Sequence, residues 1–120
     1  MTVRKPDEVP LDVVAGGTAT ARQILIGEEL SPNFAIRRFV MDAGGGMPLH
    51  TNTVEHGQYV LTGQATIRIA DETVQVSAGD SVHIPANVPH SYSVEGEERF
   101  EFLCVVPNAP DKITVVQEGN

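Results

Sequence analysis

Residues 44–63 read GGGMPLHTNTVEHGQYVLTG, and this stretch decides how the rest of the 120-residue sequence is interpreted. It begins with three glycines, carries His50 and His56, and ends at Gly63. Glycine runs favour turns, and a strand that ends at a tight turn presents its side chain in a fixed orientation. Imidazole is the commonest side-chain ligand of transition metals. The stretch therefore predicts strand ends that present metal-binding histidines.

Short β-rich runs alternate with clusters of Gly, Pro, Asn and Asp on both sides of this stretch. Ala65, Ile67 and Ile69 alternate with polar residues, as in a half-buried strand. Every connection is short, which favours antiparallel hairpins over helical crossovers. We therefore expect one all-β domain over residues 1–120, a sandwich or barrel of antiparallel strands.

Two strand boundaries follow from the same pattern. The apolar run Phe34–Val40 predicts a strand that stops at Asp42 and the glycine run. Near the C-terminus, Ile113–Val116 predicts a strand that pairs either with the N-terminal strand or with a second subunit.

The overall composition excludes several classes of partner. The chain has 8 basic and 16 acidic residues, a formal net charge of −8, which argues against nucleic acid and against an anionic membrane surface. Cys104 is the only cysteine, so no intramolecular disulfide is expected. The sequence has neither the apolar region of a signal peptide nor a run long enough to span a membrane. The expected location is the cytoplasm.

A third histidine, His90, follows a second turn segment, Asn87-Val-Pro89. Closing a barrel brings strand ends together, so we expect His50, His56 and His90 to converge. Three histidine ligands leave positions open for water or substrate, as at a reactive metal centre. His83 lies out of phase with its apolar neighbours and is expected to face solvent or a subunit contact.

The spacing resembles the two motifs of the cupin family. The first motif, G-x5-H-x-H-x3,4-E-x6-G, matches Gly44, His50, Asn52, His56 and Gly63. The second, G-x5-P-x-G-x2-H-x3-N, matches Gly79, Pro85, Asn87 and His90. The resemblance covers roughly residues 22–106 and is close to small, single-domain, RmlC-like bacterial and archaeal cupins (cupin 2 conserved barrel) with a four-histidine site. It implies a small antiparallel β-barrel of the double-stranded β-helix (jelly-roll) type over about these residues. It implies one divalent ion (Mn, Fe, Ni, Cu or Zn), held here by His50, Asn52, His56 and His90, and a homodimer.

The sequence departs from these motifs at the second histidine and at the glutamate. Asn52 replaces the histidine, and because an amide oxygen is a weak ligand, Asn52 either coordinates the metal or holds a metal-bound water. His56 stands at the glutamate position with Glu55 beside it. Neighbouring strand residues face opposite sides, and the alternation through Gln58 favours His56 as the inward residue.

Two milder departures fall in the second motif. Asn87 replaces the motif glycine, and asparagine tolerates the left-handed backbone conformation better than most residues. Val94 replaces the motif asparagine.

Three further residues are candidates for contact with a substrate. Tyr92 shares the face of His90 and either lines the cavity or belongs to the core. Gln58 is a candidate contact for a ligand or for a metal-binding residue. Arg37 and Arg38 are neighbours in an apolar strand, so one of them must point into the barrel or into an interface. An inward arginine could bind the carboxylate of a substrate, whereas an arginine at an interface would form a salt bridge. The catalytic candidates are therefore Gln58, Tyr92 and Arg37.

These features favour a metal-dependent enzyme with a small-molecule substrate and apolar cavity walls, Met47 and Phe102 among them, and oxygen-using chemistry is the leading expectation. The resemblance implies dioxygenase, other oxidoreductase, isomerase or decarboxylase-like activity. Two alternatives stay open: a non-catalytic module that binds a small ligand or a metal, and an accessory domain that acts through its dimer surface. The apolar runs Ile24–Ile26 and Phe34–Val40 also favour a homodimer, with the terminal strands as candidate interface elements.

Overall fold

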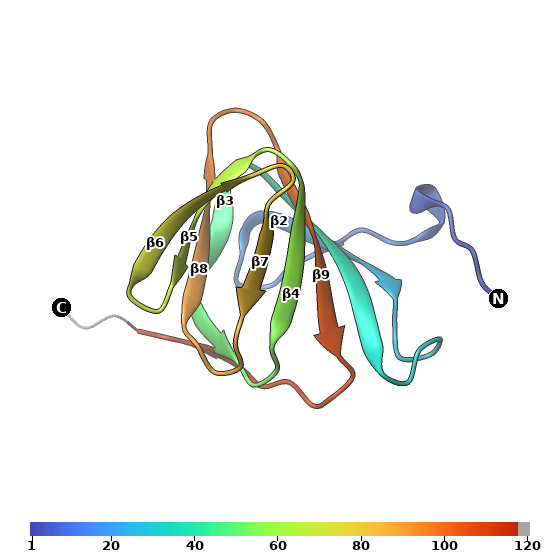
Figure 1. Ribbon diagram of the computed structural model, residues 1–120. Helices are drawn as coiled ribbons and strands as arrows, with labels where there is room; N and C mark the ends of the chain where they lie inside the picture. Colours follow the sequence, from blue (N-terminus) through green and yellow to red (C-terminus); the bar gives the residue numbers. More distant parts are fainter. Residues whose placement is uncertain (118–120) are drawn as a thin grey trace.

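The computed structural model describes residues 1–117, which form ten β-strands and one short 3₁₀ turn, η1 (Pro6–Glu8) (Figure 1). Every strand pairing is antiparallel, as the short connections predict. The all-β prediction is confirmed. The strands are β1 (Asp12–Val13), β2 (Thr18–Ile26), β3 (Phe34–Asn52), β4 (His56–Thr62), β5 (Gln64–Ile69), β6 (Glu72–Ser77), β7 (Ser81–Ile84), β8 (His90–Glu95), β9 (Phe100–Pro107) and β10 (Ile113–Val115).

One continuous sheet curls into the barrel seen in Figure 1, with the hydrogen-bonded order β6-β5-β8-β3-β9-β4-β7. The 19-residue strand β3 is central to this order. Its first half pairs with β2 and β9, and its second half pairs with β8 and β10. A single bent strand therefore joins the two faces of the barrel.

The bend in β3 corrects the prediction that this strand stops at Asp42. The strand continues through the glycine run to Asn52. Gly44 takes a φ of +80°, which turns the chain without ending the strand. At Gly46 the neighbouring strand β8 comes so close that a Cβ would overlap the backbone carbonyl oxygen of Tyr92. The glycines therefore bend β3 and let β8 approach it.

The C-terminal strand has a partner that neither prediction named. β10 pairs with the second half of β3, so that Ile113 lies opposite Asn52 and Val115 lies opposite His50. Because β3 extends as far as Asn52, it offers β10 an edge within the same chain. Within the described residues β10 pairs with β3 and not with the N-terminal strand, so the first alternative for residues 113–116 is wrong. Pairing with a second subunit stays a prediction.

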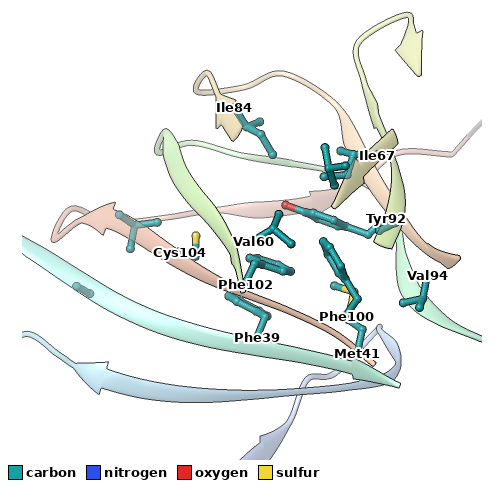
Figure 2. Packing of buried hydrophobic residues seen from close by; sticks show 14 of the residues in the cluster. Phe39, Met41, Val60, Ile67, Ile84, Tyr92, Val94, Phe100, Phe102 and Cys104 are labelled. Carbon is teal, nitrogen blue, oxygen red and sulfur yellow. The ribbon is translucent and has the colours of Figure 1, made fainter. Parts of the chain in front are cut away.

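The aromatic core lies inside the barrel (Figure 2). Phe100, Phe102 and Cys104 alternate along β9 and are at most 2% exposed, which confirms that they share a buried face. The Phe102 ring stacks on Phe39 at 5.1 Å and on Tyr92 at 5.4 Å between ring centroids. This stack fixes the inner wall of the barrel, from which Tyr92 reaches toward the histidines.

Two turn positions of the motifs require a left-handed backbone. Gly63, between β4 and β5, has a φ of +80°, and Asn87, before β8, has a φ of +66°. The structure thus confirms that Asn87 takes the conformation for which the motif uses glycine. Its backbone N–H donates a 2.7 Å hydrogen bond to the Asn52 carbonyl, which ties the loop before His90 to the end of β3.

Gly46→Ala is expected to destabilise the fold by about 2 kcal/mol or more, because the added methyl group displaces β8 from β3. Urea unfolding followed by circular dichroism measures the change. Gly57→Ala on β4 is the matched control, since a Cβ there has no heavy atom within 4 Å. Equal stability of the two variants would contradict the close packing at Gly46.

Candidate metal centre

The four candidate ligands lie at one end of the barrel, on three different strands. His50 and Asn52 are two residues apart on β3, His56 begins β4, and His90 begins β8. The pairing of β3 with β8 sets His50 directly opposite His90. Residues as far apart in the chain as 50 and 90 are therefore neighbours because β3 bends through its glycines.

These four side chains are buried and line the same cavity. Their residues are between 1% and 6% exposed. The ring centroids of His50 and His90 are 4.2 Å apart, and those of His56 and His90 are 5.9 Å apart. The structure thus brings together the residues that the two motifs predicted.

Backbone carbonyls orient two of the imidazole rings. His50 Nδ1 lies 2.7 Å from the Pro48 carbonyl oxygen, and His90 Nδ1 lies 2.9 Å from the Val88 carbonyl oxygen. A carbonyl only accepts hydrogen bonds, so in the neutral ring Nδ1 carries the proton and Nε2 keeps a free lone pair. This is the tautomer that a metal-binding imidazole needs.

Three buried polar atoms at this end of the barrel have no hydrogen-bond partner among the described residues: Asn52 Oδ1, His56 Nε2 and His90 Nε2. Burying such an atom unsatisfied costs about 1–3 kcal/mol. Two imidazole nitrogens and an amide oxygen suit a divalent transition metal. As the side chains stand, however, no three His, Cys, Asp or Glu residues among 1–117 form a group that could hold a metal ion.

Burial lowers the pKa of both His56 and His90 to about 4. For His56, the nearby Arg37 guanidinium acts in the same direction. Both imidazoles are therefore neutral at pH 7, and neutral imidazole is the form that binds metals.

Asp111, which precedes β10, is a site residue that the sequence did not reveal. Its carboxylate accepts hydrogen bonds from Asn52 Nδ2 at 3.0 Å and from the Thr53 backbone N–H at 2.9 Å. Because a carboxylate only accepts, the contact fixes the NH₂ end of the Asn52 amide and leaves Oδ1 free. Asp111 lies outside both motifs, so no spacing signal points to it.

All three catalytic candidates line the cavity. Gln58 Nε2 donates a 2.7 Å hydrogen bond to the Tyr92 hydroxyl oxygen. Burial raises the pKa of Tyr92 above its usual value, so the hydroxyl keeps its proton at neutral pH. Arg37 points inward, with Nη2 3.5 Å from Cys104 Sγ, whereas Arg38 forms a salt bridge with Glu101.

Apolar side chains make up most of the remaining wall of this cavity, whose volume is about 100 Å³. The segments that close it come from both ends of the chain: residues 14–16 and strand β10. A cavity with apolar walls and a few converging polar groups suits a small organic molecule. The apolar and aromatic lining residues include Val14, Phe39, Met47, Tyr92, Phe102, Ile113 and Val115.

His83 lies away from the cavity, as predicted. It is an exposed residue on β7, and its Nε2 is 2.9 Å from Glu55 Oε1. The same contact places Glu55 on the surface, so His56 is the inward member of the pair Glu55–His56.

An antiparallel barrel with buried histidines at one end is the architecture of a cupin, and this chain belongs to the cupin family. The cupin domain profile matches residues 37–106. An uncharacterized protein of Methanocaldococcus jannaschii is 28% identical over 87 residues, 67% of this chain and 70% of that protein. An uncharacterized protein of Streptomyces coelicolor is 30% identical over 60 residues, 50% of this chain and 57% of that protein.

Solved structures share the whole fold. The polyketide cyclase RemF from Streptomyces resistomycificus superimposes with a TM-score of 0.87 at 26% identity, covering 98% of this chain and 88% of that chain. A cupin-2 domain protein from Rhodospirillum rubrum gives a TM-score of 0.83 at 27% identity, over 98% and 81% of the two chains. Among residues 1–117, no helix is long and apolar enough to cross a membrane.

The metal-free protein is expected to lose stability as the pH falls from 6.5 through about 4. Over this range the unfolded histidines take up protons that the folded protein excludes, so the stability present above pH 6.5 is lost. The loss is about 3 kcal/mol per histidine. Urea midpoints at several pH values measure it. A variant that carries both His56→Asn and His90→Asn has a shallower dependence, and an unchanged slope would contradict the assignment.

Proposed function

We propose that this cupin is a metal-dependent enzyme whose substrate is a small, largely apolar organic molecule. One divalent ion would be held by His50, His56, His90 and the amide oxygen of Asn52. The observation that carries the proposal is the set of buried donor atoms without partners, Asn52 Oδ1, His56 Nε2 and His90 Nε2, on residues that line one cavity. In residues 1–117 no three His, Cys, Asp or Glu side chains are placed to hold an ion as they stand, and the proposal therefore includes the amide oxygen of Asn52 as a further donor.

When bound, the ion would polarise an oxygen atom of the substrate or orient it for reaction. The side chains around it have defined roles. The Pro48 and Val88 carbonyls keep the ring nitrogens Nε2 of His50 and His90 unprotonated. The Tyr92 hydroxyl accepts its hydrogen bond from Gln58, which leaves its own proton for a substrate oxygen. Phe39, Phe102 and Tyr92 would keep bulk water away from the reacting atoms.

Carbonyl chemistry is the reaction class that these groups support best. A protonated tyrosine beside a polarising centre suits the formation of an enol or the closure of a ring. RemF, whose structure this chain resembles, is a polyketide cyclase, and this similarity favours the same reaction class. The oxygen-using chemistry expected from the sequence stays a prediction, and so do the homodimer and the cytoplasmic location.

A non-catalytic binding module is the second candidate function. The specific observation in its favour is Asn52, which puts a weak amide ligand where the family motif has histidine.

The metal-loaded protein is screened against aromatic β-diketones and related carbonyl compounds, with product analysis and an oxygen electrode. Turnover supports the enzyme, and oxygen consumption identifies the oxidative class. A shift in melting temperature without turnover supports the binding module.

His56→Ala is expected to weaken the binding of Mn²⁺, Ni²⁺ or Zn²⁺ by about tenfold or more, because it removes one nitrogen ligand. Isothermal titration of the chelator-treated protein measures the affinity. His83→Ala is the matched control, since this exposed histidine lies outside the cavity. The ligand assignment is rejected if His56→Ala binds metal as tightly as the parent, or if the parent binds none of the three ions.

Asp111→Ala is expected to weaken metal binding by about tenfold, because Asn52 loses the contact that turns Oδ1 toward the cavity. Asp111→Asn retains a carbonyl acceptor and should recover part of the affinity. Asp71→Ala, in the exposed turn between β5 and β6, controls for the loss of an acidic residue. Unchanged affinity in Asp111→Ala, with an unchanged melting temperature, would show that Asp111 does not position Asn52.

A further inference from the structure

The charge of the cavity is opposite to the charge of the protein. The chain carries a formal net charge of −8. The described residues that line the cavity nevertheless include no aspartate or glutamate, and they include two arginines, Arg22 and Arg37. With histidines counted as neutral, the formal charge at the cavity wall comes from these arginines.

Arg37 reaches this wall without a neutralising partner. Its Nη2 contacts Cys104 Sγ, its guanidinium lies 5.2 Å from the ring centre of Phe39, and its Nε is buried without a hydrogen-bond partner. Within residues 1–117 it makes no ion pair. The adjacent Arg38 differs, because it donates hydrogen bonds to Glu101 and Gln23. The sequence thus places one paired and one unpaired guanidinium side by side on β3.

Arg22 adds a second positive charge to the same wall. It lies on β2, opposite Phe39, and its side chain makes no hydrogen bond or ion pair with another residue in the range 1–117. Burial lowers the pKa of Arg22, and the nearby positive charge of Arg37 lowers it further. The carboxylate of Asp12 raises it, but by less. Two guanidinium groups that repel each other at a half-buried wall are stabilised by an anion between them.

We propose that Arg22 and Arg37 bind the carboxylate of a small organic acid, and that aromatic carboxylates are the substrate class of this cavity. Guanidinium groups match carboxylate oxygens with paired hydrogen bonds, and the unsatisfied Nε of Arg37 is one such donor. Phe39, Phe102 and Met47 line the same cavity and would contact the apolar body of the acid.

This assignment rests on the proposed function in one respect, since it takes the same cavity as the substrate site. Arg37 Nη2 and His56 Nδ1 both contact Cys104 Sγ, at 3.5 Å and 3.6 Å. An acid held by its carboxylate at Arg37 therefore extends the rest of the molecule along the wall that carries the candidate ligands. The arginines select the substrate, and the histidine end of the cavity is left for the reaction.

The test uses chelator-treated protein, so that its result does not depend on a metal. Isothermal titration with benzoate and 2-naphthoate is compared with titration of the neutral benzamide and 2-naphthamide, at low and high salt. The carboxylates are expected to bind about tenfold or more tightly than the amides and to weaken as salt rises. Arg37→Gln and Arg22→Gln should each lower carboxylate affinity about tenfold.

Two further variants keep the result interpretable. Arg37→Lys retains the charge but not the paired donors, so it should bind carboxylates between the parent and Arg37→Gln. Arg99→Gln is the control, because Arg99 pairs with Asp42 on the surface and lies outside the cavity. Melting temperatures identify variants that fail to fold, and the parent titrations do not depend on them.

Three results would overturn the assignment: amides that bind as tightly as acids, glutamine variants that bind like the parent, or no binding of either acid at millimolar concentration. Failure of the metal site is a separate outcome. Retained carboxylate affinity in a protein that binds no Mn²⁺, Ni²⁺ or Zn²⁺ would reject the proposed enzyme and keep the anion site. Metal binding without a preference for carboxylates would reject the anion site and leave the proposed function standing.

Discussion

Antiparallel hydrogen bonding along a single bent strand, β3, is the constraint on which the other features depend. The strand is 19 residues long, and it pairs with β2 and β9 before its bend and with β8 and β10 after it. Arg37 stands before the bend, whereas His50 and Asn52 stand after it. Because the bend folds the two halves around one cavity, a single element supplies one of its two arginines and half of its candidate ligands. Gly44 turns the chain at the bend, and Gly46 lets β8 approach it closely.

The orientation of the histidines is set locally as well as by the barrel. His50 and His90 each place Nδ1 against the carbonyl of the residue two positions earlier, Pro48 and Val88 respectively. A contact over two residues forms with the turn itself, so each motif carries its own ring orientation. The barrel then needs only to bring the two turns together. The hydrogen bond from the Asn87 backbone to the Asn52 carbonyl does so directly.

Much of the fold and of the candidate site follows from residue patterns that act over short distances. Alternation along β9 gave the buried face of Phe102, and the choice of His56 over Glu55 followed from the opposite faces of neighbouring strand residues. Asn87 took the left-handed conformation expected of a glycine substitute. These successes share one cause: each depends on the backbone within a few residues.

The remaining features depend on contacts between distant parts of the chain. A glycine run is compatible both with the end of a strand and with a sharp bend, and only the approach of β8 decides for the bend. The partner of β10 depends on how far β3 continues. Asp111 and Arg22 lie outside the motifs, and their roles arise from packing against Asn52 and beside Arg37. No local signal distinguishes them from other surface charges.

The nitrogen and the oxygen of the Asn52 amide have different surroundings, and this side chain therefore links the interior of the barrel to the C-terminal segment. Its nitrogen is held by Asp111, and its oxygen belongs to a residue of the cavity wall. If a ligand bound at the amide oxygen strengthens the contact between the amide nitrogen and Asp111, thermodynamic reciprocity requires that this contact strengthens ligand binding by the same factor. A ligand held at the amide oxygen would therefore share one side chain with the segment that carries Asp111.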